Sequence, residues 1–353
     1  MDSLLEEALR EAYEQNVSDV FIKAHTTPIY RQFGKCLKTR FPVLGPDECR
    51  RIAESVMTPK QAQRFEDHPE LDMSLEIEGL CRFRCNVFRQ RGTYGMCLRI
   101  IPLKIKSLDD LGMPPVLKQM CLHRQGLVLL TGPTGSGKST TLAAMIDFIN
   151  QSKPLNIVTI EDPLEFVHPD KTSILNQREV GIDTESFDEA LRHVLRQAPD
   201  VILIGEMRDA DTFQIALQAG ETGHLVFSTL HTASAYETLD RIANMFPPHD
   251  KPQIALRLSN SLKGVVSQKL VPRVGGGRIA ATEIMVVTPT VAKLLEEGRS
   301  GQIYPALAEG SFYGMQTMNQ CINRYFKAGL VTEEDAMAYA GNLTELRQML
   351  RRQ

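Results

Sequence analysis

The middle of the chain alternates between short apolar runs and longer stretches in which apolar residues recur at helical spacing. Each run is three or four residues long, as expected for a strand that is buried on both faces. Strands of this kind, separated by helices, favour a mostly parallel sheet of the α/β class. The runs lie at 128–130, 157–160, 201–204 and 225–227, and the helical stretches at 140–150, 186–197 and 211–221.

The first hundred residues have a different pattern, which predicts a smaller α+β domain over residues 1–101. Residues 3–6 match a capping box, and apolar residues then recur at helical spacing. Residues 20–22 form a short apolar run, and residues 81–88 alternate with period two. Both segments are therefore expected to be strands.

Turn-forming residues separate these two patterns. Three prolines and a glycine lie between residues 102 and 115 around a polar stretch, which is typical of a linker. We therefore expect a linker over residues 102–115 and a second domain over residues 116–353. A helical tail is expected from about residue 288, with helix starts at Thr332 and Asn342.

The composition is that of a globular chain and excludes several classes of protein. The 353 residues are enough for about two domains, and 42% hydrophobic with 24% charged residues excludes a disordered chain. Forty Lys and Arg against 43 Asp and Glu leave a net charge of −3, which argues against a nucleic-acid binder. The apolar runs are far shorter than the roughly 18 residues of a membrane span. The acidic first residues do not resemble a signal peptide, so we expect a cytoplasmic protein.

The seven cysteines are interpreted as reduced thiols. Cys81 and Cys85 are the closest pair, but no second pair and no histidine cluster follows at zinc-site spacing. Residues four apart lie on the same face of a strand, so these two thiols are expected to be buried or half-buried.

The segment from Gly132 to Ser139 matches the phosphate-binding loop pattern G-x-x-x-x-G-K-[ST]. Its glycines let the backbone curl around phosphates, Lys138 supplies a charge for the β- and γ-phosphates, and Ser139 can bind Mg²⁺. An apolar run precedes the loop and an amphipathic helix follows it, which favours this interpretation over an ordinary glycine-rich turn. The candidate nucleotide-binding residues are Gly132, Thr134, Gly135, Ser136, Gly137, Lys138, Ser139 and Thr140.

Two acidic groups follow apolar runs at the strand ends where ligands bind in parallel sheets. Glu206 follows the run 201–204 and is a candidate for orienting the attacking water, with a solvated loop carboxylate as the alternative. Glu161, Asp162 and Glu165 follow the run 157–160. These three could form an ordinary polar loop, but a phosphate-binding loop and Glu206 on neighbouring strands favour positioning of metal and water. Glu161 and Asp162 are therefore candidate Mg²⁺ ligands with Ser139.

Two histidines flank the run 225–227. His231 lies at the ligand-binding end, where an imidazole could sense or polarise the γ-phosphate. For His224, at the opposite end, a structural hydrogen bond is about as plausible.

Four ordered motifs resemble the P-loop, Asp box, Walker B and His box of secretion ATPases. They lie at 131–141, 157–166, 205–209 and 222–232. The Gly-Met-Gln-Thr at 314–317 and the tail resemble the PilT/PilU branch, the type IV pilus retraction motors. The resemblance covers nearly the whole chain.

This resemblance implies a PAS-like N-terminal domain joined to a RecA-like ATPase domain, assembled as a homohexamer with ATP and Mg²⁺ between subunits. It implies that Glu206 is the catalytic glutamate and that Glu165 is also essential. By alignment, Arg84 and Arg99 are the arginines that reach the nucleotide, where a guanidinium neutralises charge on the γ-phosphate. It also implies an inner-membrane platform protein as partner, at the cytoplasmic face of the membrane beneath the pilus.

The sequence departs from the retraction family at two places. The family's Arg-Gln-Asp-Pro-Asp is Arg-Gln-Ala-Pro-Asp here, at 196–200, as in PilU-like members. The motif Ala-Ile-Arg-Asn-Leu-Ile-Arg-Glu appears at 290–297 with Ala292 and Glu296 in place of its arginines. Hydrolysis is expected to be intact, but an accessory motor that works with a paralogous retraction ATPase fits as well.

Other functions are less well supported. Assembly ATPases of pilus and type II secretion systems share the motifs, but usually carry a long N-terminal extension and zinc-binding Cys-x-x-Cys pairs, which this sequence does not show. A RecA-type nucleic-acid motor is disfavoured by the charge balance and by the lack of interleaved aromatic and basic residues. No base-reading motif of a GTPase is found. An inert scaffold is disfavoured because Lys138, Ser139 and Glu206 are all present.

Overall fold

The computed structural model describes residues 1–32, 34–101 and 105–351, which form two compact units. The first unit is Met1–Lys104 with the loop segment Pro163–Val167, and the second is Ile105–Asp162 with His168–Gln353. Residues 102–104 of the expected linker lie outside the described residues. The remaining linker residues contain no helix or strand, but Leu108 and Met113 are buried in the core of the second unit.

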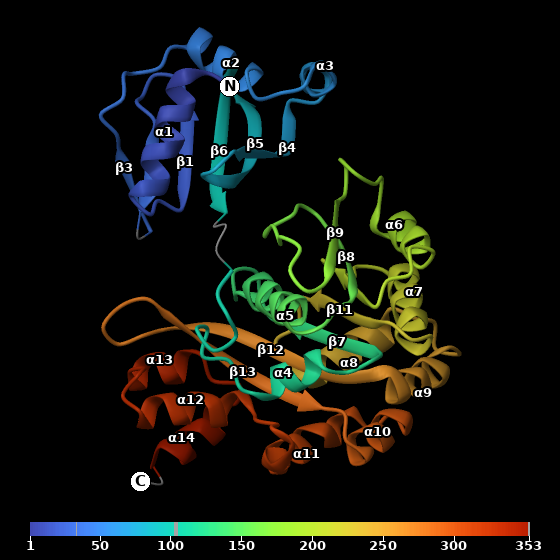
Figure 1. Cartoon of the computed structure of the whole chain (residues 1–353). Helices are drawn as coiled ribbons and strands as arrows, with labels where there is room; N and C mark the ends of the chain where they lie inside the picture. Colours follow the sequence, from blue (N-terminus) through green and yellow to red (C-terminus); the bar gives the residue numbers. More distant parts are fainter. Residues whose placement is uncertain (33, 102–104, 352–353) are drawn as a thin grey trace. The chain divides into compact units, whose positions relative to one another are not determined.

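The first unit is an antiparallel sheet in the order β3-β2-β1-β6-β5-β4, covered on one face by helices (Figure 1). Its elements are α1 (Ser3–Glu14), β1 (Asp19–Lys23), β2 (Ile29–Gln32), β3 (Lys35–Lys38), α2 (Pro46–Glu54), α3 (Pro59–Asp67), β4 (Glu70–Ile77), β5 (Cys81–Gln90) and β6 (Thr93–Ile101). Strand β1 explains this layering, because Val20 and Ile22 are buried with the apolar side of α1, whereas Asp19 and Lys23 point to the other face. We call this other face the polar face.

Helix α1 starts one residue earlier than the capping box predicted. Its N-cap is Asp2, whose carboxylate accepts a hydrogen bond from the backbone N–H of Leu4 at 3.0 Å, and Ser3 is already helical. A carboxylate near the N-terminus also interacts favourably with the helix dipole, so Asp2 takes the capping position.

The predicted thiols on β5 are buried. Both Cys81 and Cys85 have no exposed surface and belong to the core of the first unit. Burial raises the pKa of Cys81 to about 12. In the described part of the chain, no group of three His, Cys, Asp or Glu side chains gathers as in a structural zinc site.

The second unit is built on a seven-stranded sheet in the order β13-β12-β7-β11-β10-β8-β9 (Figure 1). All neighbouring strands are parallel except the edge pair β12 and β13. The strands are β7 (Gly126–Thr131), β8 (Asn156–Glu161), β9 (Ile174–Glu179), β10 (Val201–Ile204), β11 (Leu225–Leu230), β12 (Leu262–Pro272) and β13 (Arg278–Val286). The four predicted runs are thus β7, β8, β10 and β11, and the predicted α/β class is confirmed.

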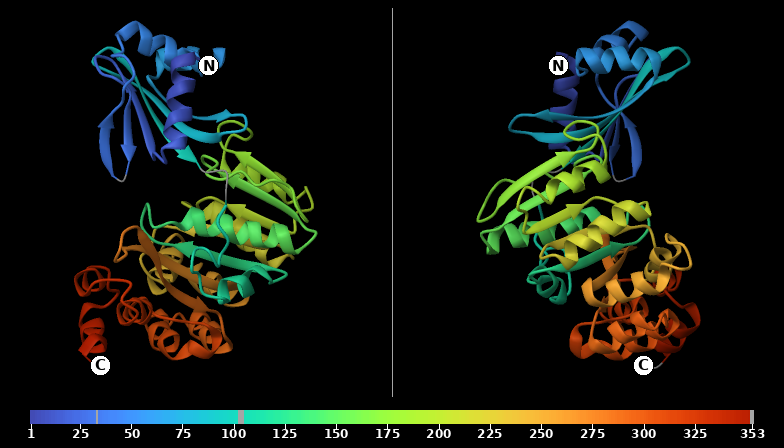
Figure 2. Two further views of the ribbon diagram at one scale, coloured as in Figure 1. Left: turned by 60° about the vertical axis from the view of Figure 1, so that its left-hand side comes forward. Right: turned by 90° about the vertical axis from the view of Figure 1, so that its right-hand side faces the viewer.

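Helices cover both faces of this sheet, as Figure 2 shows from two sides. One core cluster joins the strands to α4 and α5, and another joins them to α6, α7, α8, α9 and the start of the tail. The helices are α4 (Val116–Cys121), α5 (Lys138–Ser152), α6 (Phe187–Val194), α7 (Ala210–Glu221), α8 (Ala235–Asn244) and α9 (Lys251–Ser261). None of the described helices has the length and apolar character needed to cross a membrane.

The tail is helical from Pro289, as predicted. Thr332 caps α13 by accepting a hydrogen bond from the Asp335 N–H at 3.1 Å, and Asn342 accepts one from the Glu345 N–H at the start of α14. The tail consists of α10 (Pro289–Glu296), η1 (Ser300–Gln302), α11 (Ile303–Glu309), η2 (Gly310–Tyr313), α12 (Met318–Lys327), α13 (Glu333–Ala338) and α14 (Leu343–Arg351).

Candidate functional site

The phosphate-binding loop joins β7 to α5 and requires its glycines. Gly132, Gly135 and Gly137 have φ angles of 140°, 78° and 85°. A Cβ on Gly132 would lie 2.3 Å from the backbone oxygen of Gln268, so no other residue fits there without displacing the backbone. Gly137 is the N-cap of α5, and the loop therefore ends directly at the positive end of that helix.

Two side chains in this loop suit it to an anionic ligand. The Lys138 ammonium is buried and donates to the carbonyls of Gly132 at 2.8 Å and Pro133 at 3.1 Å. The Ser136 hydroxyl is buried and has no hydrogen-bond partner among the described residues. An unpaired buried hydroxyl beside a buried ammonium and a helix N-terminus is the environment that a phosphate group satisfies.

Side chains of strand β12 form hydrogen bonds with the loop and with the residues at its ends. The Gln268 amide is buried, donates to the Ser136 carbonyl at 2.7 Å and accepts from the Thr141 hydroxyl at 2.9 Å. One residue earlier, the Ser267 hydroxyl lies 2.8 Å from that of Thr131, at the end of β7. These contacts fix the loop to the sheet at both of its ends.

The candidate residues on four strands reach the same edge of the sheet. In the order β7, β11, β10 and β8, the carboxyl ends of these strands lead to the phosphate-binding loop, His231, Glu206 and Glu161. The prediction that the loop and Glu206 lie on neighbouring strands is wrong, because β11 lies between β7 and β10. Chain order does not determine strand order, and here the strand inserted between them brings His231 beside Glu206.

Glu206 is held by an arginine and a histidine. Arg208 donates to one carboxylate oxygen at 3.0 and 2.9 Å, and the Nε2 atom of His231 lies 3.2 Å from the other. Burial raises the pKa of Glu206, but the hydrogen bond and charge of Arg208, together with His231, lower it by more. The net effect is a pKa below the usual value of a glutamate, so the carboxylate stays ionised at a lower pH than an ordinary glutamate does.

The Asp-box carboxylates have different surroundings. Glu161 ends β8 and accepts from the Thr159 hydroxyl at 2.7 Å and the Gln177 amide at 3.4 Å, while Asp162 is exposed. Glu165 is also exposed, but it lies in the loop segment Pro163–Val167, which belongs to the first unit. The second unit alone therefore assembles Glu161, Asp162 and Glu206 but not Glu165.

His224 has the structural role that was one of its two interpretations. Its Nδ1 atom lies 3.0 Å from the carbonyl oxygen of Ala219, near the C-terminal end of α7. It is at the end of β11 opposite to His231, so it fixes the turn between α7 and β11 and not the ligand edge.

The two candidate arginines lie side by side on the polar face of the first unit. Arg84 on β5 and Arg99 on β6 are directly opposite each other in the register, and both are exposed. Arg99 donates to the buried carboxylate of Asp19 at 2.9 Å, and Arg31 lies 3.6 Å from the same carboxylate. Like charges opposite each other in a sheet are destabilising, so Asp19 offsets the cost of keeping this pair.

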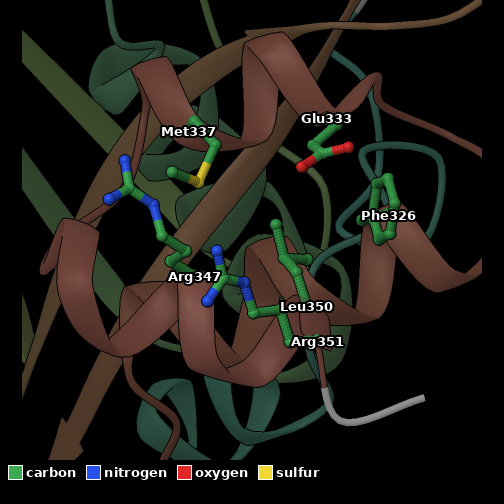
Figure 3. A pocket seen from close by; sticks show the side chains of 6 residues that line it. All are labelled: Phe326, Glu333, Met337, Arg347, Leu350 and Arg351. Carbon is green, nitrogen blue, oxygen red and sulfur yellow. The ribbon is translucent and has the colours of Figure 1, made fainter.

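A hollow of about 300 Å³ lies in the helical tail, away from the phosphate-binding loop (Figure 3). Arg347 and Arg351 from α14 and Glu333 from α13 surround an apolar floor there. None of the residues predicted from the sequence lines it. Its mixed charges and apolar floor do not indicate a phosphate site.

Comparison with known proteins decides the family. The family model described as "Type II/IV secretion system protein" matches residues 1–301. The chain belongs to this family. Within the type II/IV secretion family, it is similar to the "Type IV pilus retractation ATPase PilT" of Pseudomonas aeruginosa, with 46% identity over 330 residues, covering 94% of this chain and 96% of the relative.

Two further comparisons place the chain in the same branch of the type II/IV secretion family. The "Type IV pilus ATPase PilU" of Pseudomonas aeruginosa is 40% identical over 347 residues, covering 98% of this chain and 91% of the relative. A crystal structure of the pilus retraction motor PilT with bound ADP matches at a TM-score of 0.92 and 45% identity, covering 97% of this chain and 98% of that one. The predicted resemblance to retraction ATPases is therefore confirmed, and this member of the family is a nucleotide-using ATPase.

Three residues of the site were missed from the sequence of this family member: Arg208, Gln268 and Asp19. Arg208 had a signal, because it follows Glu206 by two residues and thus lies on the same side of an extended segment. Gln268 also had one, since it interrupts a run that is otherwise almost free of amides. Asp19 had none that a sequence shows, because its partner Arg99 is 80 positions away.

Proposed function

We propose that this chain is the subunit of a homohexameric motor that hydrolyses ATP with Mg²⁺ and powers the retraction of type IV pili. One observation carries the proposal: an ionised glutamate, fixed by Arg208 and His231, lies at the same sheet edge as an anion-binding loop. The similarity to PilT, whose solved structure contains ADP, supports ATP as the substrate.

The loop holds the phosphates of ATP. Backbone N–H groups at the start of α5, the Ser136 hydroxyl and the Lys138 ammonium supply donors and positive charge where the β- and γ-phosphates bind. When bound, Mg²⁺ would neutralise charge on these phosphates, and we assign Ser139, Glu161 and Asp162 to hold it. The Thr159 hydroxyl fixes the Glu161 carboxylate for this role.

Glu206 orients the attacking water. Because Arg208 and His231 lower its pKa, Glu206 is ionised throughout the neutral range and accepts a hydrogen bond from water. A carboxylate with a lowered pKa is a weak base. We therefore assign to Glu206 the positioning of the water and the stabilisation of the positive charge that develops on it during attack. The exposed imidazole of His231 joins Glu206 to the γ-phosphate side of the edge.

Arg84 and Arg99 complete the site of a neighbouring subunit. Asp19 contacts Arg99 and offsets part of the repulsion between these two exposed guanidinium groups, and a γ-phosphate is an anion that both can bind. A ring arrangement would bring the arginines of one subunit to the phosphates of the next. Glu165 joins the same site by this proposal, because its loop segment belongs to the unit that carries the arginines.

The mechanical role follows from the branch of the family. We place the ring at the cytoplasmic face of the inner membrane, on the platform protein beneath the pilus. Ala292 and Glu296 in α10 replace the two arginines of the retraction motif, which favours an accessory, PilU-like motor acting with a paralogous retraction ATPase. A deletion strain should then keep its surface pili but retract them weakly. A strain without surface pili would indicate an assembly ATPase instead.

The hydrolysis proposal is tested by replacing Glu206→Gln. This change keeps the shape and removes the charge, so it should lower kcat by about 10²-fold or more while nucleotide binding persists. Lys138→Ala should abolish nucleotide binding as well, and Glu189→Gln, at an exposed position on α6, is the matched control. ATP hydrolysis by Glu206→Gln at the wild-type rate would refute the assignment.

The ring proposal is tested by mixing inactive chains. An Arg84→Ala/Arg99→Ala chain and a Glu206→Gln chain should regain part of the ATPase activity together, because one kind of mixed interface contains both intact halves. Hydrolysis per subunit should also rise with protein concentration. Full activity in a fraction that light scattering identifies as monomeric would exclude a site shared between subunits.

A further inference from the structure

A hollow of about 700 Å³ lies at one end of the sheet in the first unit. Its walls come from the end of β1 and the loop after it, from β2 and β3, and from the turn between β5 and β6. This volume is within the range of sites that bind small molecules. The function proposed above does not use this hollow.

The walls of the hollow are basic. Lys23, Lys38, Arg91 and His25 line it, and there is no Asp or Glu among its described lining residues. Within the described part of the chain, the side chains of the first three form no ion pair or hydrogen bond. Elsewhere in this unit arginines are usually paired with carboxylates, as Arg89 is with Glu66. All three unpaired side chains of the hollow are exposed, so the cost to the fold is small, but together they give the hollow a positive potential that attracts anions.

Two of these residues have an unfavourable backbone conformation. Among the described residues, four other than glycine have a positive φ, and His25 at 66° and Arg91 at 49° are two of them. Arg91 and Gly92 form the two-residue turn between Gln90 and Thr93, in which both residues have a positive φ. Asn, Asp or Gly normally occupies such a turn. Strained residues of this kind concentrate at ligand sites.

The hollow is separate from the arginines assigned to the neighbouring ATP site. Along β1, Lys23 pairs with Gly95 of β6, whereas Asp19 pairs with Arg99. Four residues of strand separate the two positions, which is about 13 Å. Substitutions in the hollow therefore leave the contact between Asp19 and Arg99 in place.

We propose that this hollow binds a phosphate-bearing anion. Lys23 and Lys38 act as point charges from the strands, and the Arg91 guanidinium closes over the ligand from the turn with its fork of N–H donors. The phosphate belongs either to a free phosphorylated small molecule or to the headgroup of an anionic lipid. Both sources present negatively charged phosphate oxygens to the same three cations, although a phosphodiester headgroup carries one charge where a phosphomonoester carries about two.

The test uses the full-length chain with Lys138→Ala, which removes phosphate binding by the loop of the second unit. Inorganic pyrophosphate is titrated by calorimetry without divalent cations. The pocket variant Lys23→Ala/Lys38→Ala should weaken binding by about tenfold or more, since two charge-assisted interactions are lost. The control Lys35→Ala/Lys60→Ala removes the same charge from exposed positions outside the hollow and should bind as the parent does.

A second variant guards against effects of folding. Arg91→Gly removes the guanidinium while the backbone keeps its positive φ without strain, so this chain should be at least as stable as the parent in thermal unfolding. It should also weaken pyrophosphate binding. Equal affinity of the parent, Lys23→Ala/Lys38→Ala and Arg91→Gly for pyrophosphate, or no binding by the parent, would overturn the proposal.

The source of the phosphate is decided with vesicles of phosphatidylcholine, with and without phosphatidylglycerol. If the parent sediments with the anionic vesicles and the pocket variant does not, the ligand is a lipid headgroup. If pyrophosphate binding depends on the hollow and sedimentation does not, the ligand is a free phosphorylated molecule. The ATPase proposal is unaffected by either result, because no step of hydrolysis uses these residues.

Discussion

Two carboxylates in this chain each contact two basic side chains, one carboxylate in each unit, and they differ in exposure. Asp19 contacts Arg99 and Arg31, and its side chain is 4% exposed. Glu206 contacts Arg208 and His231, and its side chain is 22% exposed at the edge of the parallel sheet. The buried carboxylate can act only through the arginines that it positions, whereas the half-buried one is itself available to a ligand. A carboxylate between two basic side chains therefore orients the arginines in the first unit, whereas in the second unit the basic side chains orient the carboxylate.

The comparison is tested most strongly through the arginines of the first unit. If Asp19 serves to present them, Arg84→Ala/Arg99→Ala should lower the ATPase rate by about 10³-fold, the lower end for an arginine that stabilises a transferred phosphoryl group. Nucleotide binding should persist, because the phosphate-binding loop is intact. Arg10→Ala/Arg50→Ala, which removes two exposed arginines from ion pairs on α1 and α2, is the control and should leave the rate unchanged.

Asp19 itself should have a smaller effect on the rate but a clear effect on stability. Asp19→Asn keeps the size of the side chain and weakens its bonds to Arg99 and Arg31, so the arginines lose their orientation. We expect about a tenfold loss of ATPase rate and about 1–2 kcal/mol lower free energy of unfolding by urea denaturation. Glu206→Gln should cost clearly less stability, because the Glu206 carboxylate is 22% exposed and water screens its contacts. Equal destabilisation by both changes would contradict the difference drawn between the two carboxylates.

Arg208 should affect the pH dependence of the reaction. Its charge lowers the pKa of Glu206, so activity in the wild type should persist until the pH falls through this lowered value. In Arg208→Ala, burial dominates and the pKa rises, so the acid limb of kcat against pH should move to higher pH. Arg192→Ala, which breaks the exposed pair with Asp188, is the matched control.

The same linkage predicts the sign of a stability change. A carboxylate whose pKa is lowered on folding stabilises the folded state above the pKa of the unfolded chain, and this contribution is lost as the pH falls through the folded value. Arg208→Ala should therefore make the free energy of unfolding less dependent on pH in the acid range. An acid limb that coincides in Arg208→Ala and the wild type would show that Arg208 does not tune Glu206.

The smallest expected effect concerns a carboxylate that the chain lacks. Ala198 stands where the retraction family has an aspartate, and its φ is 50°. Asp tolerates the left-handed region better than Ala does, so Ala198→Asp should raise the free energy of unfolding by about 0.5 kcal/mol. Ala243→Asp, at a half-buried position on helix α8 without this strain, should not be stabilising. Denaturant unfolding measures both.

The sequence predicted those parts of the fold whose signal is local. Strands β7, β8, β10 and β11 are continuous apolar runs because both of their faces are buried, and the phosphate-binding loop is a contiguous motif. Strand β9 was missed because it is polar and partly exposed, and β12 because Ser267 and Gln268 interrupt its apolar pattern. Those two residues are buried only because Thr131 and Ser136 supply their partners.

The site was predictable in its motifs but not in its contacts. Glu206 and His231 were assigned to the correct edge, since both follow strands of one parallel sheet. That they contact each other depends on β11 lying next to β10, and strand order is set by packing across the whole unit. Arg84 was assigned through the family alone, because an exposed arginine on a strand has no distinguishing pattern.

Gln268 connects the phosphate-binding loop to the helical tail through a short series of contacts. Gln268 holds the Ser136 carbonyl, and across the β12–β13 ladder it pairs with Thr282. The backbone oxygen and hydroxyl of Thr282 accept from the Gln316 amide at 2.8 and 2.9 Å, just before α12. Three successive contacts, Ser136–Gln268, Gln268–Thr282 and Thr282–Gln316, thus connect the phosphate-binding loop to the start of α12. If these contacts are kept, a displacement of the loop also displaces the start of α12. A movement at the phosphate-binding loop is then transmitted to the helical tail.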